Sequence, residues 1–137
     1  MEVFYTYSKE LFVNHLILNV ILQVSAVTTG TLTYKDAYEN AEKTGQPLVV
    51  LVGADWCPAC QTMKHSVVPQ LAKQGVLTKV SFAMVNTDHD QALAGRLMQG
   101  GSIPQLVIYR KTAAGWQRQQ LTGAQSVEAA TSFLAKR

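Results

Sequence analysis

The sequence contains few cysteines and few charged residues. Only two of its 137 residues are cysteine, which excludes the multi-disulfide framework of small secreted scaffolds. Two cysteines fit one closed pair, one reactive pair or half of a metal site. Charged residues make up 15 %, against a usual share of about 25 %, and no run of basic residues is longer than two. Because the positive charges do not cluster, the net charge of +3 does not indicate a nucleic-acid partner.

The first thirty residues differ in composition from the rest. Residues 15–27 are mostly apolar, and short side chains precede a predicted cleavage after Ala26. This apolar stretch is shorter than the roughly 20 residues that a membrane-spanning helix needs, so a signal peptide is favoured. The leading segment is long and lacks net positive charge, which leaves an uncleaved membrane anchor and an ordinary N-terminal element as alternatives. We therefore assign residues 1–30 to a signal peptide or anchor and residues 31–137 to one domain.

Helical periodicity is clearest just after this segment. Thr33 and Asp36 form a predicted capping pair, and Gly45 is a predicted helix end. Between them, apolar and aromatic residues recur on one helical stripe. The stripe comprises Tyr34, Ala37, Tyr38 and Ala41. Further helices are predicted over residues 61–75, perturbed at Pro69, over residues 90–101, and from Ser126 onward.

Four strands are predicted between these helices. Residues 47–53 and 79–86 are short apolar runs of the kind that is buried on both faces of a sheet. Residues 105–110 and 115–121 are strands separated by a turn. The alternation of helix and strand predicts parallel pairing in the first half, and the adjacent strands predict an antiparallel pair at the end. The expected fold is α/β, with a mixed central sheet flanked by helices on both faces.

Both cysteines lie in one motif, Cys-Pro-Ala-Cys, after the first strand. Cys57 would meet unpaired backbone N–H groups and the positive end of a helix dipole, which should lower its pKa below about 8.5. Pro58 suits the first helical position, and Cys60 lies one turn further on, where it should be the less exposed of the two thiols. This arrangement supplies an attacking thiolate and a resolving thiol for disulfide exchange.

Two other uses of the cysteine pair stay open. A structural disulfide across so short a loop would add little stability. A soft metal such as Cu(I) could be bound if Met63 and His65 joined the cysteines, although helical spacing favours Met63 as a core residue. No second Cys-x-x-Cys pair completes a zinc site.

The chain resembles the thioredoxin family over residues 33–136. Residues 54–60 (ADWCPAC) are similar to the family's Trp-Cys-x-x-Cys at a strand–helix junction. Residues 102–109 (SIPQLVIY) resemble its segment with a cis proline before a central strand, and residues 121–134 resemble the strand-end glycine that leads into the last helix. All three features occur in the family's order, so the resemblance implies a thioredoxin fold.

The resemblance also implies roles for matched residues. Cys57 would be the nucleophile and Cys60 the resolving thiol, with no cofactor and no metal. The predicted substrate-binding residues are Trp56 and Pro58 beside the cysteines, Ile103, whose backbone would bind an extended segment, and Pro104, which would be cis and lie against the cysteines.

Two departures from the family concern proton transfer. Leu51 occupies the position of the family's buried acid, and Met84 that of a lysine often found near it. Cys60 would then need water or another group to take its proton, since Asp55, the nearest acid in sequence, is expected to be exposed. These changes argue against a general cytoplasmic thioredoxin. Residues 41–60 (AEKTGQPLVVLVGADWCPAC), followed by Met63, look more like the extracytoplasmic thioredoxin-like proteins of bacteria.

The predicted function is therefore that of a thiol–disulfide oxidoreductase that reduces protein disulfides. The expected location is periplasmic or secreted, with an N-terminal membrane association as a variant of it. Expected partners are protein clients and a separate redox partner, and a monomer is favoured. The alternatives are a disulfide oxidase or isomerase and a copper-binding thiol chaperone.

Overall fold

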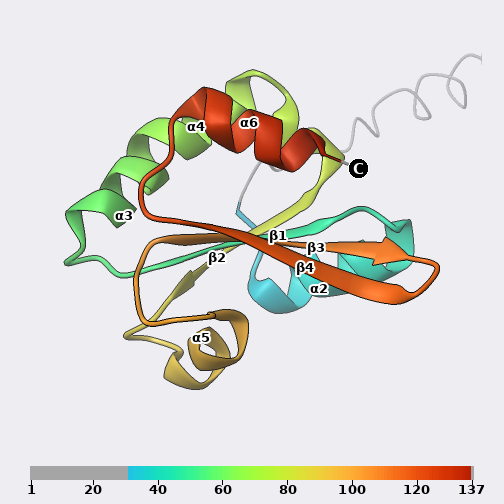
Figure 1. Ribbon diagram of the computed structural model, residues 1–137, viewed down its shortest axis with the longest axis horizontal. Helices are drawn as coiled ribbons and strands as arrows, with labels where there is room; N and C mark the ends of the chain where they lie inside the picture. Colours follow the sequence, from blue (N-terminus) through green and yellow to red (C-terminus); the bar gives the residue numbers. More distant parts are fainter. Residues whose placement is uncertain (1–30, 137) are drawn as a thin grey trace, which may run out of the picture. The chain divides into compact units, whose positions relative to one another are not determined.

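A computed structural model of the protein describes residues 31–136. Its sheet has four strands in the order β2-β1-β3-β4, and α2 and α5 cover one face while α3, α4 and α6 cover the other (Figure 1). This arrangement is the thioredoxin fold, and it confirms the predicted mixed sheet. The strands are β1 (Leu48–Gly53), β2 (Ser81–Asn86), β3 (Gln105–Thr112) and β4 (Gly115–Thr122). The helices are α2 (Tyr34–Thr44), α3 (Pro58–Thr62), α4 (Val68–Lys73), α5 (Gln91–Leu97) and α6 (Val127–Ala135).

The sheet combines parallel and antiparallel pairing. β1 pairs parallel with β2 and antiparallel with β3, and β3 pairs antiparallel with β4. Because side chains alternate along a strand, each inner strand supplies residues to two separate cores. Val49 and Leu51 of β1 pack toward α4 and α6, whereas Val50 and Val52 pack toward α2 and α5. This burial on both faces explains why β1 is an uninterrupted apolar run.

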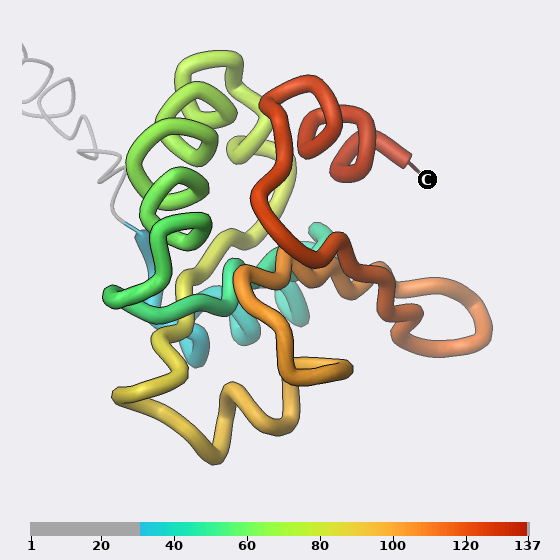
Figure 2. Tube along the Cα trace, turned by 60° about the vertical axis from the view of Figure 1, so that its left-hand side comes forward, coloured from blue at the N-terminus to red at the C-terminus, as the bar shows by residue number. Residues whose placement is uncertain are grey.

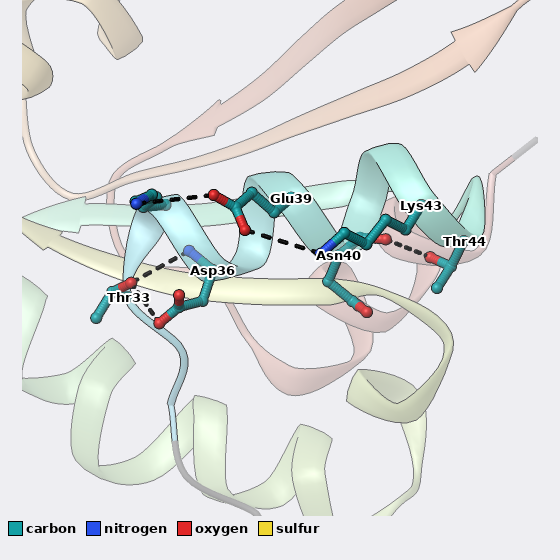
Figure 3. A network of polar contacts seen from close by, with 7 residues as sticks. Thr33, Asp36, Glu39, Asn40, Lys43 and Thr44 are labelled. Atoms are coloured by element: carbon teal, nitrogen blue, oxygen red, sulfur yellow. Dashed lines mark hydrogen bonds and ion pairs between the residues drawn. The ribbon is translucent and has the colours of Figure 1, made fainter.

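The first helix of the domain follows its predicted signals (Figure 3). Thr33 is the N-cap, and its Oγ1 accepts a hydrogen bond from the Asp36 amide at 3.2 Å. Gly45 ends the helix in the left-handed conformation, with φ 74°. Only the small residues of the predicted stripe, Ala37 and Ala41, are fully buried. The close packing of α2 on the sheet is thus achieved by alanines, and the tyrosines lie at the rim of the contact.

Two predicted helices differ in detail from the structure. The helix after the motif is perturbed near Pro69, as predicted, and the perturbation is a π-helical turn, η1 (Met63–Val67), between α3 and α4. Pro69 has no N–H to continue the α-helical pattern, and it stands at the start of α4, where that donor is not needed. The helix predicted to end at Gly100 and Gly101 ends instead at Leu97.

The chain segments that enter α3 and β3 lie at the same end of the sheet (Figure 2). Ile103, just before β3, packs against the cluster of Ala54, Cys57 and Cys60. Within residues 31–136, no helix is long and apolar enough to cross a bilayer. The signal peptide or anchor predicted over residues 1–30 lies outside the described residues.

Candidate active site

The structure places Cys57 at the N-cap of α3. Its Sγ accepts a hydrogen bond from the Cys60 amide at 3.2 Å, and its backbone φ of −90° and ψ of 113° are extended rather than helical. Pro58 follows at the first helical position and is exposed. Amides at a helix start stabilise negative charge, so this position favours the thiolate form of Cys57.

Cys57 and Cys60 form a disulfide across this turn, with their Cα atoms 5.2 Å apart. Cys57 is 6 % exposed and Cys60 5 %, so exposure does not distinguish the two residues in the disulfide form. The expectation that Cys57 is the more exposed thiol is therefore not met here, because the disulfide holds both sulfurs in the same small cluster. Within the described residues, the two cysteines differ in that the Sγ of Cys57, and not that of Cys60, accepts a backbone hydrogen bond.

Trp56, directly before the pair, is 71 % exposed. It lines a cavity of about 290 Å³ together with Met98, Gly101 and Ile103. An exposed indole beside a disulfide is an apolar surface of the kind that is enriched at protein interfaces. The predicted neighbours Trp56 and Ile103 are thus brought together on one side of Cys57.

The segment before β3 has an uncommon backbone. The Ile103–Pro104 bond is cis, as the resemblance implied, and Pro104 is fully buried. The Pro104 carbonyl accepts a hydrogen bond from the Gly123 amide at 2.8 Å. No hydrogen bond formed among residues 31–136 uses the N–H or the C=O of Ile103. With respect to the part of the chain that the structure describes, Ile103 therefore has a free donor and a free acceptor next to the cysteine pair.

A second cavity, of about 230 Å³, reaches Cys60 from the other side. Leu51 and Met84 line it and are directly paired across β1 and β2, so the family's buried acid and lysine are both replaced by apolar side chains. Asp55 also lines this cavity but is exposed, as expected, and is held by Lys64 at 3.6 Å and Asn86 at 3.0 Å. The charged side chains that line this cavity, Asp55 and Lys64, are thus both exposed.

The residues considered for metal binding have other contacts. Met63 is fully buried in the core, and its Sδ accepts a hydrogen bond from the Gln125 amide at 3.2 Å. His65 lies 2.9 Å from the Gln61 side chain. Among the described residues, no three His, Cys, Asp or Glu side chains are grouped closely enough to hold a metal ion.

Two residues that support the site from outside it were not singled out from the sequence. Gly53, at the end of β1, lies so close to Cys60 that a Cβ at this position would be 3.0 Å from both its Cβ and its Sγ. Gln105 is fully buried and bonded to the loop before Ile103. A glycine closing a valine-rich strand and a glutamine opening an apolar one were the available signals.

A disulfide at the start of a helix, after a central strand and beside the residue that precedes a cis proline, defines the class of thioredoxin-fold proteins with a redox-active cysteine pair. The Thioredoxin-like family profile matches residues 29–111, more than half of the sequence. The chain belongs to this Thioredoxin-like family.

Solved structures of thioredoxins resemble the chain. A thioredoxin from Thermus thermophilus is 25 % identical, with a TM-score of 0.63 over 74 % of this chain and 81 % of that chain. The protein Trxlp from Edwardsiella tarda is 27 % identical, with a TM-score of 0.58 over 74 % of this chain and 93 % of that chain. Chloroplastic thioredoxin z, at 16 % identity and a TM-score of 0.63 over 80 % of this chain and 93 % of that chain, shares the fold. No curated protein sequence matches the chain.

Proposed function

We propose that the protein reduces disulfides of client proteins by dithiol exchange through Cys57 and Cys60. The observation that carries this proposal is the Cys57–Cys60 disulfide at the N-terminus of α3, beside the exposed Trp56. A structural disulfide of sequence separation 3 would add little stability, so a staple is a poor account of the pair.

The reaction has two exchange steps. The Cys57 thiolate attacks one sulfur of the client disulfide, forms a mixed disulfide and releases the first client thiolate, which takes up a proton. Cys60 then loses its proton and attacks Cys57 Sγ, which closes the protein disulfide and releases the second client thiolate. The client gains two electrons and two protons, and a separate dithiol reductant restores the cysteine pair.

The reductive direction is supported by the lack of a cationic side chain bonded to Cys57 within residues 31–136. Strong oxidants of this fold owe their oxidising potential to a strongly stabilised reduced form. Among the hydrogen bonds within residues 31–136, Cys57 Sγ accepts one, from the Cys60 amide, and none from a side-chain cation. The expected reduction potential is therefore nearer to about −270 mV, which is typical of thioredoxin, than to about −120 mV, which is typical of a strong disulfide oxidase of the same fold.

The proposed location is extracytoplasmic, behind a signal peptide or anchor. The apolar segment at residues 15–27 supports this, as does the persistence of disulfides in oxidising compartments. Mass spectrometry of the mature chain would test it, since cleavage after Ala26 should leave Val27 as the first residue. A chain that retains Met1 and remains in the cytoplasmic fraction would contradict this location.

The function is tested by insulin reduction with a dithiol-regenerated sample of the full chain, and by equilibration with glutathione buffers. Cys57→Ala should abolish reduction. Cys60→Ala should accumulate mixed disulfides between Cys57 and clients, because the attacker remains without its resolver. Full activity in both variants would reject dithiol exchange, and a potential near that of the oxidase would reverse the proposed direction.

A further inference from the structure

The loop between α5 and β3 is held from behind by one buried side chain, Gln105. This glutamine is 0 % exposed, at the first position of a strand whose next residues are apolar. A buried amide has to form its hydrogen bonds within the protein, since leaving them unmade is costly. All of its partners lie in the loop that leads to Ile103.

The amide of Gln105 is satisfied on both sides. Its Nε2 donates to the Ser102 carbonyl at 2.9 Å and to the Gln99 carbonyl at 3.0 Å, and the Gly100 carbonyl lies at 3.4 Å. Its Oε1 accepts from the Gln99 amide at 3.2 Å. An amide nitrogen has two hydrogens, so the two shorter contacts are the main bonds. The side chain thereby fixes the loop at its start and at its last peptide unit.

The bond to Ser102 determines where the Ile103 N–H points. The Ser102 carbonyl and the Ile103 N–H belong to the same planar peptide unit, and this bond is trans. In a trans peptide unit the two groups point in opposite directions. Because Gln105 draws the carbonyl toward the interior of the protein, the Ile103 N–H must point away from it. That N–H has no partner within residues 31–136, and Ile103 lines the cavity beside Trp56.

We propose that Gln105 is a positioning residue that presents the Ile103 N–H as a hydrogen-bond donor to the backbone of an extended client segment. This inference rests on the proposed function. The family resemblance already implies that the backbone of Ile103 binds an extended segment, and the inference adds the side chain that orients its N–H. A small disulfide that lacks a peptide backbone makes no use of the donor. Gln105 therefore affects peptide clients and leaves thiol chemistry unchanged.

The first experiment compares two disulfide substrates in the full chain. Gln105→Met keeps the size of the side chain and removes its N–H donors together with the oxygen that accepts from the Gln99 amide. It should raise KM for a peptide disulfide roughly fivefold, the value of one ordinary hydrogen bond. The rate with bis(2-hydroxyethyl) disulfide should stay unchanged. An equal loss with both substrates, or no loss with either, would overturn the proposal.

Gln120→Met is the matched control. Gln120 also donates to the Gln99 carbonyl, at 3.2 Å, but it forms no bond with Ser102. Its replacement should lower the melting temperature without a change in KM for the peptide. If Gln120→Met raises KM as much as Gln105→Met does, the effect is general loosening of the loop and not orientation of one peptide unit.

The second experiment does not depend on turnover or on the direction of electron flow. A cysteine peptide is joined to Cys57 of the Cys60→Ala variant as a mixed disulfide, and hydrogen exchange of the Ile103 amide is followed by NMR. The amide should be protected at least fivefold on attachment, and the protection should disappear when Gln105→Met is added. An Ile103 amide that is unprotected with Gln105 in place would refute the assignment, even where the Gln105→Met variant does not fold. If the intact protein reduces neither substrate, the proposed function fails while this measurement still decides the role of Gln105.

Discussion

The substitution Gly53→Ala should make the reduction potential of the cysteine pair less negative. Gly53 does not have the positive φ that would strain an alanine, so the cost of the added methyl group is purely one of space. The new Cβ would lie 3.0 Å from the Cβ and the Sγ of Cys60, against about 3.5–4.0 Å for a favourable carbon contact. Overpacking of this kind costs about 1–3 kcal/mol.

The direction of the shift in reduction potential follows from the rotational freedom of the Cys60 sulfur. In the disulfide form Sγ is tied to Cys57 and cannot turn away from residue 53, whereas in the dithiol form it can rotate about χ1. The close contact with the Cβ of Cys60 remains in both forms, whereas the contact with its Sγ is relieved in the dithiol form. Roughly half of the overpacking energy, about 0.5–1.5 kcal/mol, therefore destabilises the disulfide form alone. For a two-electron couple this corresponds to a shift of about 10–30 mV toward less negative potential.

The assay is equilibration of the full chain in graded glutathione buffers, with melting temperatures of both redox forms. Gly53→Ala should lower the melting temperature of the oxidised form more than that of the reduced form. Gly95→Ala is the control, because a Cβ there meets nothing within 4 Å and should leave the potential unchanged. An unchanged or more negative potential in Gly53→Ala would show that Cys60 does not move away from residue 53 on reduction.

Three further predictions concern stability. Met63→Ala should lower the free energy of unfolding in urea by about 2–5 kcal/mol, because Met63 is fully buried. Met63→Leu should lower it by less than about 1.5 kcal/mol. Equal effects of the two substitutions would contradict this prediction. Arg110 donates to two carbonyls at the end of α6, so Arg110→Met should lower the free energy of unfolding by about 1–3 kcal/mol. Lys111→Met, at the exposed neighbouring residue, should lower it distinctly less. The reverse order would argue that Arg110 does not cap this helix. Burial, with a smaller effect of Tyr109 and Tyr38, raises the pKa of Tyr34 above 10.0. The unfolded chain then loses this proton first, so stability should fall as pH rises past about 10, and Tyr34→Phe should remove that part of the slope in melting temperature.

Local signals were sufficient to predict much of the fold. Thr33 and Asp36 fixed the start of α2 and Gly45 its end, since capping depends on neighbours in sequence. The end of α5 could not be predicted in this way. The glycines at 100 and 101 suggested a later end, but the chain leaves the helix after Leu97, and Gln99 is bonded to Gln105 instead. Gln105 belongs to a strand, so a pattern of helical periodicity cannot predict its bonds to Gln99.

The predicted parts of the candidate site are those carried by contiguous motifs. Cys57 and Cys60 are close in sequence, and the segment with Ile103 precedes an apolar strand that is easily located. Gly53 and Gln105 could not be found in this way, because each contacts a segment that is reached only through the fold. The close approach of Gly53 to Cys60 depends on how the chain turns between β1 and α3, and sequence spacing does not give such distances.

If the protein exchanges disulfides with clients as proposed, the apolar residues behind Cys60 determine how long it stays covalently attached to a client. Leu51 and Met84 offer no acceptor for the Cys60 proton, and Asp55 is held by Lys64 and Asn86. A cavity of about 230 Å³ has room for several water molecules, through which the proton can leave. Release of the client then follows the fraction of Cys60 that is ionised. In the range where that fraction is small, the dwell time of the mixed disulfide should lengthen tenfold for each unit by which the pH falls. A more acidic compartment would thus turn a brief exchange into a persistent covalent complex.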